Sequence, residues 1–314
     1  MGLANLVPGI SGGTMLLATG VYQHFVAAVA ELATLRFRIQ TIAVLGSILL
    51  GAGVAVIAAA GIAEHLVVHY QWVMYSLFIG LTLGGAPLLL TMIKPLEKTA
   101  VMWGIAGFAA MAVLTWAQMG GSTAEPISSS WIMLFIAGIA AGAAMVLPGV
   151  SGSYLLLVLG QYLAMVAGIR AIRDAISDWS FDGILATMPV ILPIGVGIVI
   201  GVVVVSVVVK FLLDRCRAAT LGFLLGLLLG AVLGLWPFRA GIEPEVGDVI
   251  RGERIGTTEQ ASEIDPAHWN TATFTPSMTQ GGVSLVLVLG GLAISLAIGR
   301  LGRNPSDEQA PREC

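Results

Sequence analysis

A block of sixteen residues occurs twice in this chain, and this duplication limits the possible folds more than any other feature. Residues 7–22 read VPGISGGTMLLATGVY, and residues 147–162 read LPGVSGSYLLLVLGQY. The two blocks, the first motif and the second motif below, align without a gap at a spacing of 140 positions. A hydrophobic chain repeats Leu and Gly easily, but not P-G-x-S-G followed by Tyr at one fixed distance. We interpret the blocks as an internal duplication of a special backbone site.

The composition predicts a membrane protein. Of the 314 residues, 57% are hydrophobic and 11% are charged, whereas a soluble domain has about 25% charged residues. The 40 glycines suit helices that pack closely in lipid. A net charge of −3 suggests no nucleic-acid partner. The two cysteines lack a metal-ligand spacing, and we expect neither a metal nor another cofactor.

Six apolar runs are long enough to cross a bilayer, at residues 40–63, 70–92, 99–118, 187–209, 219–237 and 281–299. The arms beside the two motifs are shorter. The arm at residues 14–30 reaches only about 25 Å, against a hydrocarbon core of about 30 Å. Broken backbone survives at membrane depth only where protein or a water-filled cavity satisfies it. We therefore predict re-entrant hairpins at residues 1–30 and 131–169.

Charge counting favours the re-entrant topology over one in which each motif segment crosses once. In the re-entrant topology, one face carries ten basic residues and the other face carries five. The ten are Arg36, Arg38, Lys94, Lys98, Lys210, Arg215, Arg217, Arg300, Arg303 and Arg312. Three crossings separate the motifs, and an odd number places the hairpins on opposite faces. Residues 78–85 and 224–231, FIGLTLGG and LLGLLLGA, are a weaker echo of the same duplication.

The predicted fold is therefore an all-α polytopic membrane protein with two inverted repeats, each a re-entrant helical hairpin plus three transmembrane helices. The first repeat covers residues 1–118, where the leading arm of the hairpin is expected to be truncated. A linker at residues 119–130 joins it to the second repeat, at residues 131–299. The second repeat contains a polar extramembrane loop at 238–280, and a polar tail follows at 300–314.

The motif chemistry favours an anion site. Pro removes an amide donor, glycines permit close approach, and a helix that begins after such a turn points free N–H groups into the break. A phosphate or carboxylate fits that position. The candidate phosphate-binding residues are Asn5, Ser11, Gly12, Gly13, Thr14, Ser151, Gly152 and Ser153. The alternative is a tight helix–helix turn in which Ser11 and Ser151 only cap the next helix.

Charged and aromatic residues near the hairpins allow two interpretations each. The arginines could steer an anionic headgroup or act only as orientation signals, and these are Arg36, Arg38, Arg170 and Arg173. Three carboxylates near segment ends could couple transport to protons or simply be solvated, namely Glu31, Glu64 and Asp174. For Tyr22 and Tyr162 we favour a place in the interfacial aromatic belt.

Four stretches make the chain similar to the PopT family of bacterial membrane proteins. They are ANLVPGISGGTMLLATGVY, LFIGLTLGG, AAMVLPGVSGSYLLLVLGQY and ATLGFLLGLLLGAVLGLWPF, and they extend from Ala4 to Phe238. The resemblance implies a multi-pass protein of the bacterial cytoplasmic membrane that returns undecaprenyl phosphate to the inner leaflet for cell-envelope synthesis. Two features depart from the family: the short lead before the first motif and the long insertion at 238–280.

Three classes of function follow. The first is a polyprenyl-phosphate translocase with alternating access, in which helix N-termini hold the phosphate. The second is a channel or transporter for a small inorganic or organic anion, which the same helix starts would suit. An enzyme acting on lipid phosphates is the weakest, because only His24 and Glu31 lie near a motif as candidate bases. The oligomeric state is not predicted.

Overall fold

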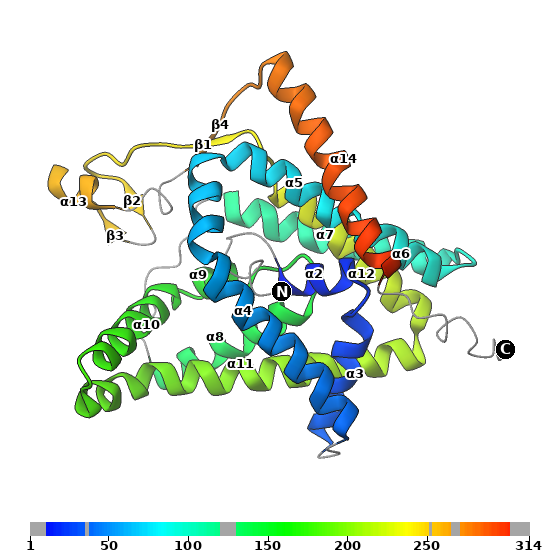
Figure 1. Cartoon of the computed structure of the whole chain (residues 1–314), viewed down its shortest axis with the longest axis horizontal. Helices are drawn as coiled ribbons and strands as arrows, with labels where there is room; N and C mark the ends of the chain where they lie inside the picture. Colours follow the sequence, from blue (N-terminus) through cyan, green and yellow to red (C-terminus); the bar gives the residue numbers. More distant parts are fainter. Residues whose placement is uncertain (1–10, 35–37, 120–129, 251–252, 265–270, 302–314) are drawn as a thin grey trace.

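The membrane part of the protein is built from helices, as the sequence predicts (Figure 1). This computed structural model describes residues 11–34, 38–119, 130–250, 253–264 and 271–301. The helices of the first half are α2 (Gly12–Ala18), α3 (Tyr22–Ala33), α4 (Ile39–His69), α5 (Gln71–Leu83), α6 (Gly85–Ile93) and α7 (Lys98–Met119). Those of the second half are α8 (Trp131–Val146), α9 (Gly152–Val158), α10 (Tyr162–Ser177), α11 (Phe181–Arg215), α12 (Arg217–Gly234), α13 (Thr258–Glu263) and α14 (Met278–Leu301).

Within the described residues, five helical segments are long and apolar enough to cross a membrane. They are Gln71–Ile93, Lys98–Trp116, Phe181–Arg215, Arg217–Gly234 and Met278–Arg300. Each coincides with a predicted span, which confirms a multi-pass helical membrane protein. The sixth predicted span lies in α4, where the apolar stretch Ile39–Val54 is shorter than these five segments.

Helix α11 begins earlier than the hydropathy of the sequence predicts, at Phe181 rather than at residue 187. The Ser180 hydroxyl accepts a hydrogen bond from the Gly183 amide at 3.1 Å and caps the helix. Capping therefore extends the helix beyond its apolar run, into a polar turn that contains Asp182.

The polar segment between α12 and α14 contains short strands that the all-helical prediction omitted. Strand β1 (Arg239–Gly241) pairs antiparallel with β4 (Thr271–Thr273), and β2 (Val249–Ile250) pairs with β3 (Glu253–Arg254). Edge-to-face contacts join Trp236 to Phe238 and Phe238 to Phe274, which tie this segment to the end of α12.

The described part of the first motif, residues 11–22, folds like residues 151–162 of the second. Helices α2 and α9 each have seven residues, and they start at Gly12 and Gly152, at the motif spacing of 140. Each is followed by a glycine with positive φ, +76° at Gly20 and +67° at Gly160, before the next helix begins at Tyr22 or Tyr162. The sequence duplication is therefore also a duplication of backbone conformation.

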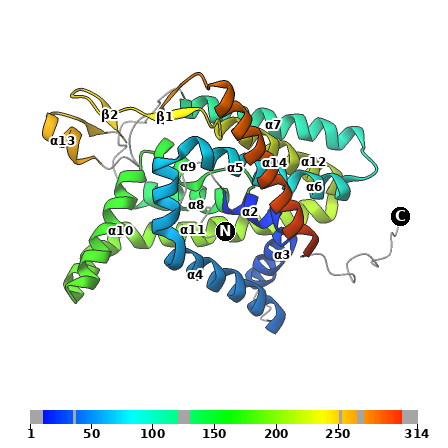
Figure 2. The ribbon, with the colours of Figure 1, turned by 45° about the horizontal axis from the view of Figure 1, so that its top comes forward.

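Both segments of the echo, residues 78–85 and 224–231, contain a glycine at a close helix crossing. Gly80 in α5 lies directly against the Val288 carbonyl of α14, and Gly226 in α12 lies directly against the Gly104 carbonyl of α7. No side chain fits at either position, so the backbones approach closely, as is common between membrane helices. The side-by-side pairs α5–α14 and α7–α12 are visible in Figures 1 and 2.

Helix α11 carries both arms that flank the second motif. Gly138 and Gly142 of α8 lie against the carbonyls of Ile194 and Ile198, and the two helices run parallel. Gly168 of α10 faces the side chains of Val190 and Ile191 on the same stretch of α11. The arms before and after the second motif therefore both pack on α11, within residues 190–201.

Candidate anion site at the paired motifs

The two motifs, far apart in sequence, bind directly to each other. The Ser11 hydroxyl donates a hydrogen bond to the Leu147 carbonyl oxygen at 3.0 Å. The Gly149 amide donates a hydrogen bond to the Thr14 hydroxyl at 2.8 Å. Each bond joins a side chain of the first motif to the backbone of the second, so the duplicated breaks form one continuous polar junction between α2 and α8–α9.

Close backbone approach explains why parts of the junction are glycine. A Cβ atom on Gly13 would lie 2.8 Å from the Val146 carbonyl oxygen, at the end of α8. Gly149 has φ of +87°, and a Cβ there would lie 2.8 Å from the Leu227 carbonyl oxygen of α12. A larger residue at either place would separate the motifs or displace α12.

The hydroxyl groups of the junction are buried inside the protein. Ser11 is 4% exposed, Thr14 2% and Ser151 6%. Ser151 and Ser153 share a hydrogen bond of 3.0 Å between their hydroxyls. Because these hydroxyls are removed from water, a hydrogen bond from one of them to an anion would be stronger than the same bond at the surface.

The capping alternative is wrong for the Ser11 side chain. Ser11 occupies the N-cap position of α2, but its hydroxyl makes no capping bond to that helix. The hydroxyl instead binds Leu147, in the other half of the chain. Its chemistry is therefore that of a contact between the motifs.

Two of the predicted carboxylates, Glu31 and Asp174, lie on helices that lead away from this junction. Glu31 is near the far end of α3, nine residues beyond Tyr22, which corresponds to about 14 Å along the helix. Asp174 is an exposed residue of α10. Arg170 and Arg173 also lie in α10, and Glu64 lies in α4, whereas Asn5 and Arg36 fall outside the described residues.

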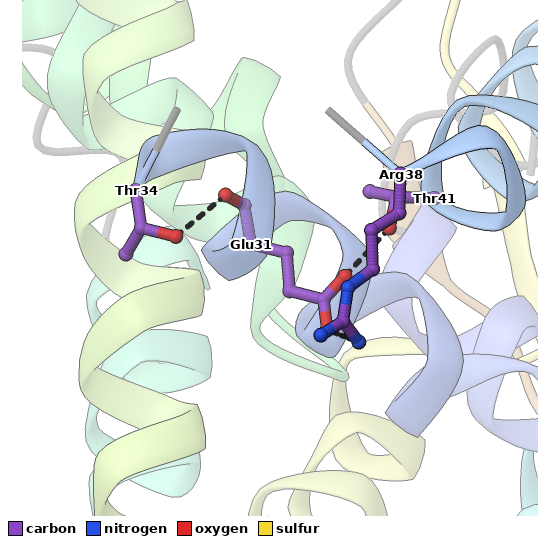
Figure 3. A network of polar contacts seen from close by, with 4 residues as sticks. All are labelled: Glu31, Thr34, Arg38 and Thr41. Carbon is purple, nitrogen blue, oxygen red and sulfur yellow. Dashed lines mark hydrogen bonds and ion pairs between the residues drawn. The ribbon is translucent and has the colours of Figure 1, made fainter. Parts of the chain in front are cut away.

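Glu31 instead organises the connection between α3 and α4 (Figure 3). The Thr41 hydroxyl donates to its Oε2 at 2.6 Å, and the Arg38 guanidinium lies 3.9 Å from its Oε1. The Thr34 hydroxyl donates to the Glu31 backbone carbonyl at 2.8 Å. The carboxylate thus ties the end of α3 to the start of α4.

Comparison with known protein families identifies the chain's relatives. The family model described as "VCA0040-like: Undecaprenyl phosphate translocase-like" matches residues 1–248, which include both motifs. The chain belongs to this family. Members of this translocase family are transporters, so the protein is not an enzyme, and the resemblance drawn from the motifs is confirmed.

Two curated relatives carry the same description. A polyprenyl-phosphate transporter of Vibrio cholerae is 28% identical over 312 residues, covering 95% of this chain and 92% of that protein. A polyprenyl-phosphate transporter of Staphylococcus aureus is 30% identical over 181 residues, covering 55% of this chain and 63% of that protein. No solved structure matches the chain.

For this family member, the interpretation of Tyr22 as an interfacial residue is wrong. Tyr22 is 4% exposed and packs in the main hydrophobic core, and its hydroxyl has no hydrogen-bond partner among the described residues. Tyr162 is partly exposed and packs near Leu156 instead. The two tyrosines start equivalent helices but differ in their surroundings.

Sequence reasoning missed the support that α12 gives to the second motif. Gly149 packs on Leu227 and Ala231, which lie in the run GFLLGLLLGA. The density of glycine in that run was the available signal, since small residues mark close helix contacts. It indicated close packing without indicating the partner.

Proposed function

We propose that this protein moves undecaprenyl phosphate across the bacterial cytoplasmic membrane, so that the carrier lipid is reused in cell-envelope synthesis. Membership of the translocase family and the names of both relatives support this substrate. The multi-pass helical architecture supports a transport role. The substrate is a lipid with one anionic headgroup, which requires a polar site at membrane depth and an apolar path beside it.

The proposed architecture is two inverted repeats, each with a re-entrant hairpin. The common packing of α8 and α10 along residues 190–198 of α11 supports a hairpin that enters and leaves on one face. The crossings at Gly80 and Gly226 support the repeat, because each joins the third element of one half to the last helix of the other. Such an arrangement gives two similar gates that can open alternately.

The phosphate would be held at the junction of the motifs, and the bond between Ser11 and Leu147 is the observation that carries this proposal. A Ser hydroxyl can donate one hydrogen bond, and Ser11 donates it to the Leu147 carbonyl oxygen. A phosphate oxygen can accept that hydrogen bond only when the Leu147 carbonyl no longer does. Phosphate binding therefore competes with contact between the motifs, and this competition couples occupancy to the opening of a gate.

The residues for this step are those that the sequence suggested. Ser11 and Thr14 would act from the first motif, with Gly12, Gly13 and Asn5 beside them, while Ser151, Gly152 and Ser153 would act from the second. Arg36, Arg38, Arg170 and Arg173 would guide the headgroup towards the hairpins. Glu31, Glu64 and Asp174 are the candidates for coupling to protons.

Reconstituted vesicles test the proposal directly. Purified protein in vesicles of defined phospholipids is expected to move undecaprenyl phosphate between leaflets, measured by the access of an external probe to the phosphate. Ser11→Ala and Ser151→Ala should each slow this movement by about tenfold, equivalent to one lost charged hydrogen bond. Ser47→Ala is the matched control, because the Ser47 hydroxyl is exposed and binds only its own helix, at Val44.

Two outcomes would contradict the proposal. Wild-type protein that leaves undecaprenyl phosphate in place but conducts chloride or carboxylates would support the small-anion transporter instead. Full transport by both serine variants would remove the motif hydroxyls from the mechanism.

A further inference from the structure

An apolar groove lies on the outer face of the protein between α6, α7 and α12. Its volume is about 350 Å³, and all of its lining residues are apolar or glycine. Ile93, which is 4% exposed, and Ala100, which is 3% exposed, form the floor. The rim is more open, with Val101 at 45%, Ile105 at 66% and Phe108 at 40% exposed. At membrane depth, such a groove opens to lipid.

One end of this groove is basic. Lys94 directly follows Ile93, and Lys98 begins α7 two residues before Ala100. Arg217 begins α12, which runs parallel to α7 because Gly222 packs on Ala100 and Gly226 on Gly104. Figures 1 and 2 both show the α6–α7 connection and the start of α12 at the same end of the molecule.

These three cations are available to an anion. Lys94, Lys98 and Arg217 are all exposed, and Glu97 in the same connection is exposed too. Among the residues that the structure describes, Arg38 forms an ion pair with Glu31. Within this part of the chain, none of the three cations is paired with a carboxylate. An apolar groove that ends in unpaired cations matches a lipid with an anionic headgroup and a hydrocarbon tail.

The groove is separated from the motif junction by one helix. Leu225 and Leu229 of α12 line the groove, whereas Leu227 and Ala231 contact Gly149 of the second motif. Residues two apart on a helix point to nearly opposite faces. The groove and the junction therefore use the two sides of α12, and they are different sites.

We propose that this groove is a second binding site for polyprenyl phosphate, at the basic face of the protein. Lys94 and Lys98 hold the phosphate, with Arg217 beside them, and the first isoprene units of the tail lie along Ile105 and Phe108. The identity of the ligand rests on the proposed function. A single branched chain suits one narrow groove with one basic end, and its volume lies near the lower end of the range of about 300–1,000 Å³ for small-molecule sites.

Photolabelling of the full-length protein tests the site without relying on transport. The probe is undecaprenyl phosphate with a diazirine in its first isoprene units, in vesicles of phosphatidylcholine, and labelled peptides are located by mass spectrometry. Labelling is expected on α6, α7 or α12 near the groove. Unlabelled undecaprenyl phosphate should compete, whereas the same concentration of phosphatidylglycerol should not.

Two sets of variants separate the tail from the headgroup. Ile105→Trp fills the groove and should reduce labelling there by about tenfold. Val113→Trp lies on the same helix with a similar exposure of 64%, outside the groove, and should leave labelling unchanged. A second probe, the uncharged polyprenol with the same diazirine, tests the headgroup. The double variant Lys94→Gln and Lys98→Gln should weaken labelling by the phosphate probe but not by this polyprenol probe.

Each outcome decides one question. Equal competition by phosphatidylglycerol, or unchanged labelling of the Ile105→Trp protein, would overturn the groove as a polyprenyl-phosphate site. Transport with no label in the groove would leave the proposed function intact and would also overturn the groove. Specific labelling of a protein that moves no lipid would support the groove and contradict the proposed function.

Discussion

The Ser11 hydroxyl and the Leu147 carbonyl oxygen, separated by 136 residues in the chain, are joined by a hydrogen bond of 3.0 Å. Together with the bond from the Gly149 amide to Thr14, it connects the two copies of one duplicated motif. The bond between Gly149 and Thr14 is buried, and Ser11 is only 4% exposed, so an unpaired polar group at either place is costly. The junction should therefore contribute measurably to stability as well as to transport.

Thr14→Val removes the acceptor of the Gly149 amide while it keeps the shape of the side chain. The amide would remain buried without a partner, so the free energy of unfolding should fall by about 1–3 kcal/mol. Denaturation in detergent, followed by a spectroscopic probe, measures the change. Thr91→Val is the control, because the Thr91 hydroxyl is exposed and binds the Leu88 carbonyl of its own helix. Equal losses in both variants would contradict a special role for the junction.

Gly149→Ala should destabilise the protein more than Gly247→Ala does. Both glycines have positive φ, +87° and +106°, so each substitution carries a backbone cost of about 1–2 kcal/mol. Only at Gly149 does the new Cβ also meet another helix, 2.8 Å from the Leu227 carbonyl oxygen, whereas nothing lies within 4 Å of a Cβ on Gly247. The difference in unfolding free energy between the variants isolates the contact with α12. Identical losses would mean that α12 shifts away from residue 149 at no cost in stability.

Alanine should have opposite effects at buried and open helix glycines. At Gly80 and Gly226 a Cβ would overlap the backbone of the crossing helix, and we expect losses of about 1–3 kcal/mol. At Gly290 of α14 nothing lies within 4 Å, so Gly290→Ala should be neutral or stabilise by up to about 1 kcal/mol. Thermal unfolding in one detergent compares the three. If Gly80→Ala and Gly226→Ala differ strongly from each other, the two crossings are not equivalent.

Glu31 should tolerate Gln better than Ala. Gln keeps an acceptor for the Thr41 hydroxyl and loses the ion pair with Arg38, whose side chain is 66% exposed, so that the pair contributes little. Ala leaves the hydroxyl of Thr41, a residue that is 4% exposed, without that acceptor, and this should cost about 1–3 kcal/mol. Unfolding of Glu31→Gln and Glu31→Ala measures the difference, with Glu97→Ala as an exposed control.

The same Glu31→Gln protein also tests proton coupling. If Glu31 carries the coupled proton, the dependence of transport on pH should flatten in this variant. An unchanged pH profile with nearly unchanged stability would assign Glu31 to the structural connection between α3 and α4 alone.

By itself, the sequence determined the helical membrane class, the positions of five helices long and apolar enough to span a membrane, and the like conformation of residues 11–22 and 151–162. These features depend on local properties: apolar length, and glycine and proline at fixed spacing. The capping of α11 by Ser180 and the strands between α12 and α14 were missed, because a polar turn and short strand pairs leave a weak hydropathy signal.

Only the tertiary structure decided which groups meet. The sequence placed Ser11 in a helix break, but it did not predict the hydrogen bond from Ser11 to Leu147 or the one from Gly149 to Thr14. It also placed Tyr22 at an interface, although the fold buries that side chain. Partners that are more than a hundred residues apart depend on how the helices pack. At the motif junction the backbones approach closely at Gly13 and Gly149, and the local sequence does not show which segments meet there.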